Sequence, residues 1–306
     1  MSGLVDSFFG CLPEVALEQY TRRGVSRATI RIDNDRLWPF LERFSVLTQI
    51  TPEEVDAYVF ELEERLSLAS VQSYKQTLKT FFNWCVNQGF LQKSPAVHLK
   101  PKRRRSARYK AANERDLQVV INGLLGTLNR RKDRRRCVRD LLAFKLALDS
   151  GNRLQELARL STRDMTLALQ NPQMATGGVV VYTVPSAPGK KGVVSMRFTE
   201  QTAAIYRLWE EIRPGSSRHR IFIALRGKYP GKPLTLNGFT SIFVKRCKQY
   251  DVPIYRTHSI RHLKGTKTTD AFNPRVTASL LNISVETAIL HYYSEAEQSV
   301  LDATAM

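Results

Sequence analysis

The sequence predicts a mainly α-helical protein with one small antiparallel β-sheet, an α+β fold in two domains. Three observations lead to this. Apolar residues recur at helical spacing in the first third, a strongly basic stretch without apolar periodicity follows, and two β-branched runs flank a turn signal later. With 306 residues the chain is long enough for two ordinary domains. We expect a helical domain at 1–99, a basic linker at 100–112 and an α+β domain at 113–306.

The first domain is expected to be a small bundle of short helices. Residues 27–44 carry a weak helical pattern that Pro39 would kink or break. The TPEE sequence at 51–54 has the form of a capping box with proline at the first helical position, so a helix begins there. Ser70 can cap the next helix, and Gly89 suits its end.

The second domain mixes helices with two strands. Asn113 is a suitable N-cap for a helix that begins at Glu114. A basic run over 130–139 leads into an apolar helix and is expected to form its outer turn. The other expected elements are, in chain order, helix 138–148, strand Val179–Val184, turn 185–192, strand Val193–Thr199, helices 201–212 and 237–249, and a helical stretch from Thr257 with breaks near Asn273 and Asn282.

The charge balance indicates a polyanionic partner. The chain has 47 Lys and Arg against 28 Asp and Glu, a net charge of +19, which is typical of nucleic-acid binding. Seven of the eleven residues at 100–110 are basic. The plain interpretation is a solvated linker, and we expect its charges also to lie along a phosphate backbone. These residues are Lys100, Lys102, Arg103, Arg104, Arg105, Arg108 and Lys110.

Several classes of protein are disfavoured. The four cysteines are far apart and form no CxxC pair, so we expect no zinc or redox site, and Cys85 and Cys247 are expected to be buried free thiols in a reducing cytoplasm. No apolar run approaches the roughly 18 residues of a membrane span, and the N-terminus lacks the basic region of a signal peptide. We therefore expect a cytoplasmic protein with no metal, no cofactor and no membrane partner.

Two cationic positions could act on a phosphate. Arg153 follows the helix stop at Gly151, and Glu156 could hold it through an i, i+3 ion pair, although such an arginine is more often a surface charge. Lys190 and Lys191 lie at the expected hairpin tip between two glycines. They are either solvated turn residues or ammonium groups that can reach an active site.

The sequence HSIRH at 258–262 places His258, Arg261 and His262 on one face of the first turns of a helix, with Thr257 as its expected N-cap. Cationic donors at a helix N-terminus favour a phosphate. A metal site is the less favoured alternative, because HExxH is absent and Arg261 would repel a cation. The simplest interpretation is one exposed and one buried histidine.

The sequence HYY at 291–293 closes the predicted C-terminal helices. Tyrosines there are usually packing residues. A tyrosine hydroxyl can also attack phosphorus if cations neutralise the phosphate.

Taken in order, an arginine, a hairpin lysine, an HxxR box and a late tyrosine resemble the pattern of the tyrosine recombinases, also called the phage-integrase family. The resemblance spans residues 13–295 and is best in the last two-thirds. GNRLQELARL at 151–160 resembles the first arginine box, and HSIRH at 258–262 resembles the HxLRH box. Leu280 and Leu281, with a tyrosine eleven residues after Leu281, resemble the third box. The resemblance implies a DNA clamp built from a helical core-binding domain and a catalytic domain.

The resemblance also implies roles for single residues. Arg153 and Arg261 would clamp the scissile phosphate, and Lys190, or Lys191 after a one-residue slip, would be the general acid. His258 would be a general acid/base or a phosphate donor. Tyr292 would be the nucleophile, with Tyr293 as the alternative if the third box has an extra residue.

One departure concerns the third box. The family usually has Gly-His or Gly-Trp nine residues before the nucleophile, and this chain has Asn282-Ile283. His262 or His291 are the candidates to replace the missing donor.

The implied reaction is site-specific recombination of double-stranded DNA through a 3′-phosphotyrosyl intermediate, carried out by a homo-oligomer, expected to be a tetramer on two DNA sites. The phosphotyrosyl bond keeps the energy of the broken strand, so neither ATP nor a P-loop is needed. The tail at 294–306 would dock onto a neighbouring protomer or fray. Three alternatives remain: a type IB topoisomerase, a DNA-binding protein with a decayed site, and a basic RNA-binding protein.

Overall fold

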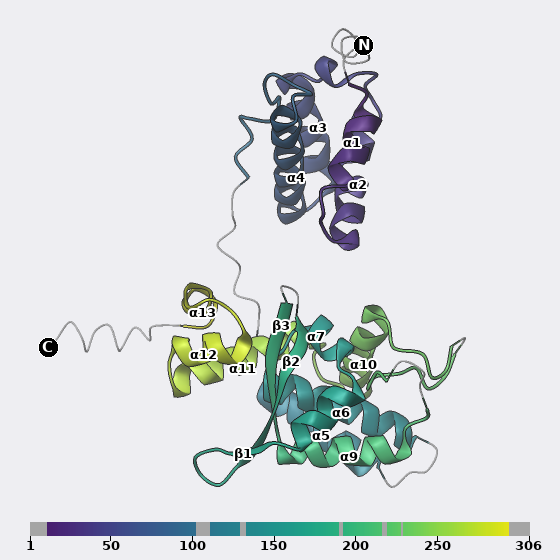
Figure 1. Cartoon of the computed structure of the whole chain (residues 1–306), viewed down its shortest axis with the longest axis vertical. Helices are drawn as coiled ribbons and strands as arrows, with labels where there is room; N and C mark the ends of the chain where they lie inside the picture. Colours follow the sequence, from purple (N-terminus) through teal and green to yellow (C-terminus); the bar gives the residue numbers. More distant parts are fainter. Residues whose placement is uncertain are drawn as a thin grey trace, which may run out of the picture. The chain divides into compact units, whose positions relative to one another are not determined.

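The computed structural model describes residues 11–101, 111–128, 133–189, 192–215, 219–227 and 229–293, and only the backbone at 185–189 and 192–194. The chain divides into two compact units, Met1–Ala107 and Arg108–Met306 (Figure 1). The division falls within the stretch expected to be a linker. The mainly helical fold with one small antiparallel sheet is confirmed.

The first unit is a helical bundle in which α4 packs against the three other long helices. Its core is rich in aromatic side chains, among them Tyr20, Phe40, Tyr58, Phe81 and Phe82, which are almost fully buried and in ring contact. Burial of so many rings stabilises a unit of this size. Its elements are α1 (Pro13–Thr21), α2 (Arg27–Leu41), a short 3₁₀ turn (Leu47–Gln49), α3 (Pro52–Arg65) and α4 (Leu68–Asn87).

Two predictions for this unit are wrong in detail. The N-cap of α4 is Ser67, whose hydroxyl accepts from the Ser70 backbone N–H at 3.4 Å, so Ser70 lies inside the first turn. The residues between them, Leu and Ala, are strong helix formers and extend the helix. Of the two alternatives for Pro39, the break is wrong: Pro39 lies inside α2 on its exposed face, two residues before the last residue Leu41, where one lost hydrogen bond is tolerated. The predicted cap at Thr51 is confirmed.

The second unit is built around α6, which is buried on most sides. It contacts α5, α7, α9, α10, α11 and β3. The predicted cap at Asn113 and the helix breaks near Asn273 and Asn282 are confirmed. The elements are α5 (Glu114–Gly126), α6 (Arg134–Ser150), α7 (Leu154–Arg159), α8 (Thr162–Leu169), β1 (Pro172–Met174), β2 (Val180–Gly189), β3 (Gly192–Thr199), α9 (Glu200–Ile212), α10 (Leu236–Gln249), α11 (Thr257–Ala271), α12 (Pro274–Leu281) and α13 (Val285–Tyr292).

The sheet is antiparallel in the order β1-β2-β3. The prediction of a turn over 185–192 is wrong, because β2 continues to Gly189 and β3 begins at Gly192. β1 pairs only with Val180–Tyr182, so among the described residues no strand pairs with the rest of β2 on that side, where prolines are tolerated. The β2–β3 register is irregular between Val184 and Ala187.

The basic run at 130–139 is only partly an outer turn. α6 begins at Arg134, and residues 129–132 lie outside the described part of the chain. Arg139 is buried, with two of its nitrogens on Asp140 Oδ1, at 2.9 and 2.7 Å, and a third on the Ile223 carbonyl. Buried Arg246 binds the other oxygen of Asp140 at 2.8 Å. Arg246 therefore ties the Asp140 carboxylate of α6 to α10, and Arg139 joins the same carboxylate to the Ile223 carbonyl.

In the described residues no helix has both the length and the apolar character needed to cross a membrane. Cys85 and Cys247 are buried free thiols, as predicted.

Asp149 joins the end of α6 to the start of α9. Its Oδ2 accepts from the Thr199 N–H and hydroxyl, both at 2.8 Å, and from the Thr202 hydroxyl at 2.6 Å. Thr202 is fully buried, so loss of the carboxylate leaves a hydroxyl without this acceptor. We expect Asp149→Ala to lower the free energy of unfolding by about 2–4 kcal/mol in urea titrations.

Asp133→Ala is the matched control for Asp149→Ala. Asp133 precedes the same helix, makes no side-chain cap and lies 3.8 Å from Arg136. Its loss should cost less than about 1 kcal/mol. Equal destabilisation by the two variants would contradict the role of Asp149 as the link between α6 and α9.

Candidate active site

Arg153 is held at the junction between α6 and α7. It occupies the N-cap position of α7, and Glu156 accepts both its backbone N–H at 2.7 Å and its Nη1 at 3.1 Å. Glu156 is 1% exposed, whereas Arg153 is half-buried. The predicted i, i+3 pair is therefore confirmed, and it leaves one side of the guanidinium open to solvent.

Arg261 is buried on α11 and bridges two helix ends. Its Nη1 donates to the Gly151 carbonyl at 2.8 Å and its Nη2 to the Leu281 carbonyl at 2.7 Å. Burial lowers the pKa of the guanidinium, and the charge of Arg153 lowers it further, whereas Tyr292 opposes the shift. Arg153 and Tyr292 thus both lie close to the Arg261 guanidinium.

Gly151 makes this close approach possible. It ends α6 with φ +62°, and a Cβ there would lie 2.6 Å from Leu281 Cδ2 and 3.2 Å from Lys264 Cγ. A side chain would be strained by the backbone angle and would push α11 and α12 away. Glycine therefore allows the Gly151 carbonyl to reach Arg261.

The two histidines of the HSIRH sequence have different surroundings. His258 is exposed and His262 is 4% exposed, with ring centroids 4.9 Å apart. The predicted N-cap at Thr257 is wrong: Arg256 holds that position, and Thr257 is the buried first residue of α11. Desolvation lowers the pKa of His262 to about 4, and the charges of His258, His291 and Arg261 act in the same direction. Desolvation also lowers the pKa of His258, together with the charges of Arg261, Arg153 and His291.

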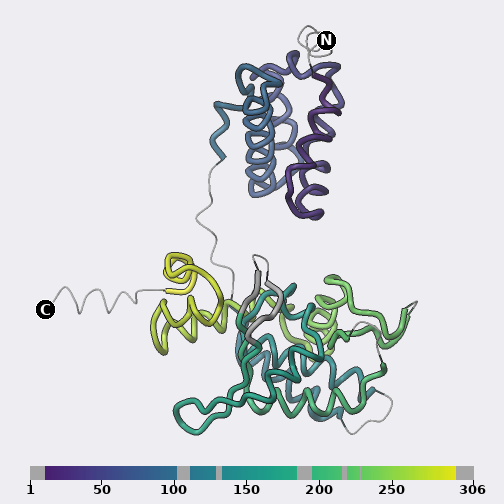
Figure 2. The backbone as a smooth tube through the Cα atoms, viewed as in Figure 1, coloured from purple at the N-terminus to yellow at the C-terminus, as the bar shows by residue number. Residues whose placement is uncertain are grey.

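Tyr292 lies in the same cluster, whereas Tyr293 is 41% exposed. Tyr292 is the last residue of α13, is 6% exposed, and has its ring centroid 5.0 Å from that of His262. A Cβ on Gly265 would lie 2.4 Å from Tyr292 Cδ1, so the ring lies directly on the α11 backbone. The contact joins α11 to α13, in the C-terminal part of the chain that runs from yellow-green to yellow in Figure 2.

Asn282 and Ile283, the two residues that depart from the third box, are held by different contacts. Asn282 ends α12 in the left-handed region at φ +51°, which asparagine tolerates better than most residues, and its Nδ2 donates to the Ser195 carbonyl at 2.9 Å. Ile283 packs in an apolar cluster with Leu281, Ala288 and Tyr292. Asparagine therefore adopts the left-handed backbone at 282, while the side chain at 283 offers hydrocarbon and no donor.

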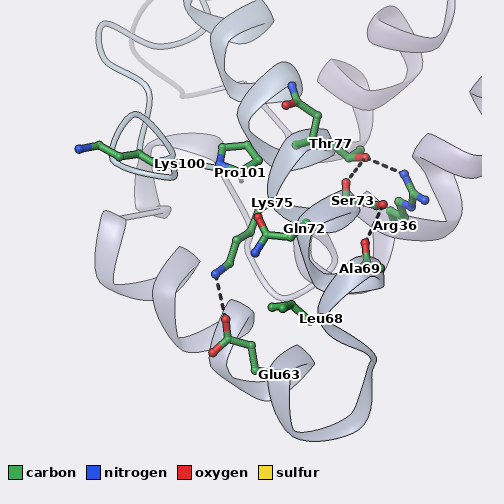
Figure 3. A pocket seen from close by; sticks show the side chains of 11 residues that line it. Arg36, Glu63, Leu68, Ala69, Gln72, Ser73, Lys75, Thr77, Lys100 and Pro101 are labelled. Carbon is green, nitrogen blue, oxygen red and sulfur yellow. Dashed lines mark hydrogen bonds and ion pairs between the residues drawn. The ribbon is translucent and has the colours of Figure 1, made fainter. Parts of the chain in front are cut away.

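Several predicted site residues lie outside the described part of the chain. These are Lys190, Lys191, Lys102, Arg103, Arg104, Arg105, Arg108 and Lys110. Lys100 is described. It lines an open groove of about 1020 Å³ on the first unit, formed mainly by the polar face of α4 (Figure 3). In that groove Lys75 Nζ pairs with Glu63 at 2.8 Å, and Arg36 Nη1 donates to the Thr77 hydroxyl at 3.2 Å.

The sequence argument missed two residues of this site. Gly265 is the surface on which Tyr292 packs, and a glycine inside a helical pattern was the available signal. Asn152, next to Arg153, is 1% exposed, and neither polar atom of its side chain has a hydrogen-bond partner among the described residues. Such a group is rare in a core and often belongs to a functional site. The described residues hold no group of three or more His, Cys, Asp or Glu suited to a metal.

No protein-family model matches the sequence, and no curated protein matches it. Solved structures do match. The Tn1549 transposon integrase in complex with a circular intermediate DNA aligns with a TM-score of 0.70 at 16% identity, over 97% of this chain and 99% of that one. The XerH recombinase bound to difH substrate aligns at 0.68 and 18% identity, over 97% and 85%. A lambda integrase dimer bound to a COC′ core site aligns at 0.65 and 14% identity, over 92% and 79%. The chain therefore has the fold of these integrases and recombinases.

Gly265 provides a test of the packing of Tyr292. In an ordinary helix Gly→Ala stabilises by up to about 1 kcal/mol. At this position the added methyl meets the Tyr292 ring, so we expect Gly265→Ala to destabilise by about 1–3 kcal/mol in urea unfolding. Gly126→Ala, with open space at the Cβ, should not destabilise the chain. A Gly265→Ala variant as stable as the wild type would refute the contact.

The buried His262 side chain should make the stability of the protein depend on pH. Its folded-state pKa of about 4 lies below the ordinary 6.5, so the unfolded chain binds more protons between these values. Stability should therefore be fully present above about pH 6.5 and fall as the pH decreases toward 4, by on the order of 3 kcal/mol from this group. Urea unfolding across this range should show a flatter pH dependence for His262→Gln than for the wild type. A pH dependence of His262→Gln as steep as that of the wild type would contradict this origin of the slope.

Proposed function

We propose that the chain is a tyrosine recombinase that breaks and rejoins DNA strands. The observation that carries this is the convergence of Arg153, Arg261 and Tyr292 from three separate elements, with His258 at the same place. Two arginines and a tyrosine gathered in this way fit a phosphodiester, since guanidinium groups match phosphate oxygens. The fold shared with solved integrases and recombinases supports the same conclusion.

The electrostatics favour an anion at this place. Arg153 and Arg261 bring two positive charges together, and buried Glu156 supplies one negative charge. A phosphate next to Arg153 would offset the excess positive charge. Losing one such donor typically slows a reaction by about 10²–10³.

In the proposed cleavage, the Tyr292 hydroxyl attacks the scissile phosphorus and its proton passes to a base, for which His258 is the exposed imidazole. The bond from phosphorus to the 5′ oxygen breaks, and Lys190 gives that oxygen a proton. The products are a 3′-phosphotyrosyl link and a free 5′-hydroxyl. Attack by a 5′-hydroxyl on the phosphotyrosine reverses these steps and rejoins the DNA without ATP or metal.

Both units would contact the DNA. We propose that residues 1–99 form the core-binding domain, 100–112 a linker along the backbone, and 113–306 the catalytic domain. The net charge of +19 supports a duplex partner. The groove on α4 presents Gln72 and Gln76, whose amides can pair with adenine edges in the major groove.

We propose a tetramer on two DNA sites as the active assembly, in the cytoplasm where the DNA lies. A lambda integrase structure of this fold is a tetramer bound to a Holliday junction, with a TM-score of 0.65.

The test of the proposed function is covalent trapping. Nicked duplexes tiled across the DNA that flanks the gene are incubated with the protein and separated on denaturing gels. The wild type should form a protein–DNA adduct on a subset of duplexes. Tyr292→Phe should abolish the adduct, because the attacking oxygen is gone, while duplex binding in gel-shift assays stays within about threefold.

Tyr293→Phe is the matched control. It removes the neighbouring hydroxyl from an exposed side chain and should leave the adduct unchanged. Loss of the adduct only in Tyr293→Phe would move the nucleophile by one residue. Tight binding without any adduct from the wild type would instead favour a decayed DNA-binding protein. Plasmid relaxation without strand exchange would favour a topoisomerase.

A further inference from the structure

His291 precedes Tyr292 on α13 and belongs to the same cluster of rings. Its ring centroid lies 6.5 Å from that of His262 and 6.4 Å from that of Tyr292, and His262 lies 4.9 Å from His258. We propose that His291 is a catalytic residue that donates a hydrogen bond to a non-bridging oxygen of the scissile phosphate. This inference rests on the proposed function.

The two arginines of the site use part of their donors in contacts within the protein. A guanidinium carries five N–H groups. Arg261 gives one from Nη1 to Gly151 and one from Nη2 to Leu281, and Arg153 gives one from Nη1 to Glu156. Ile283, at the position where the resemblance implies a histidine or tryptophan, has no side-chain donor to add.

His291 is better placed for this role than His262. His262 is 4% exposed, lies against the Tyr292 ring, and is neutral at neutral pH because its pKa is about 4. His291 is half-buried, so a substrate can reach it. Of these two imidazoles, His291 is therefore the one that a substrate can approach from solvent.

The charges around His291 agree with this position. It lies close enough to His258 and His262 to lower the pKa of each. Those two histidines face it from α11, and Tyr292 is its neighbour on α13. His258, in turn, lies close enough to Arg261 and Arg153 for their charges to lower its pKa. A phosphate bound beside these groups would offer a charged acceptor to the imidazole N–H of His291.

A pair of substitutions separates donation from packing. His291→Leu keeps the volume and removes the N–H, whereas His291→Gln keeps an N–H donor of similar reach. The rate of adduct formation is measured in a single turnover on the nicked duplex that traps the wild type. We expect His291→Leu to be about 10²–10³-fold slower and His291→Gln to stay within about tenfold of the wild type.

Leu290→Ala is the matched control on the same helix. Leu290 is 64% exposed, and its truncation should leave the rate within about threefold of the wild type. A circular dichroism melt verifies that each variant is folded. Equal rates for His291→Leu and the wild type, or equally slow rates for His291→Leu and His291→Gln, would overturn the inference.

A substrate with sulfur in place of the bridging 5′ oxygen separates the two kinds of proton donor. A thiolate leaves without protonation, because the pKa of a thiol is far below that of an alcohol. This substrate should suppress the defect of Lys190→Ala and leave the defect of His291→Leu unchanged. Suppression for His291→Leu would make His291 a leaving-group acid and overturn its assignment as a donor to the non-bridging oxygen.

The single-turnover measurement of adduct formation also separates the inference from the proposed function. Absence of any adduct with the wild type would overturn the proposed function. An adduct that needs Tyr292 but forms equally fast without His291 would overturn only the inference.

Discussion

The site depends on the buried guanidinium of Arg261. Its two nitrogens bind the Gly151 and Leu281 carbonyls, which lie where α6 and α12 end and have no partner within their own helices. These carbonyls are also the negative ends of helix dipoles, so a cation between them is stabilised. One side chain therefore sets the spacing of two helix ends. Arg153 follows the first end by two residues, and the helix that carries Tyr292 follows the second.

Two groups, each of one carboxylate and two arginines, lie near opposite ends of α6. One is Asp140 with Arg139 and Arg246, and the other is Glu156 with Arg153 and Arg261. Arg139 and Arg246 are both buried, and their nitrogens bind Asp140, a carbonyl and a glutamine. That group is closed and joins helices. Arg153 is half-buried, and Glu156 takes only part of its capacity. The second group is open on one side, so a ligand can approach it. The first group only links elements inside the protein.

Local signals in the sequence predicted most of the fold, and long-range contacts accounted for what was missed. The caps at Thr51 and Asn113 and the break at Asn282 depend on neighbouring residues, so they could be inferred from the sequence. The extent of β2 could not, because its prolines are tolerated only where β1 stops pairing. The residues of the HSIRH sequence could be identified as candidates from their local pattern. The partners of Arg261 could not, because they are carbonyls distant in the chain. That Tyr292 rather than Tyr293 packs on α11 could not be inferred from the sequence either, because it depends on the position of α11 beneath the ring.

Gly151 and Gly265 carry no reactive group, yet each is fixed by the absence of a side chain. Every other amino acid adds a Cβ, which would come within 2.6 Å of Leu281 at one position and 2.4 Å of Tyr292 at the other. No codon change that replaces these glycines therefore avoids the clash, however conservative the new residue. In a saturation mutagenesis map of the chain, both positions would rank among the least tolerant to substitution, beside the arginines. Such a map alone would not distinguish two glycines that leave room for a neighbour from residues that take part in a reaction.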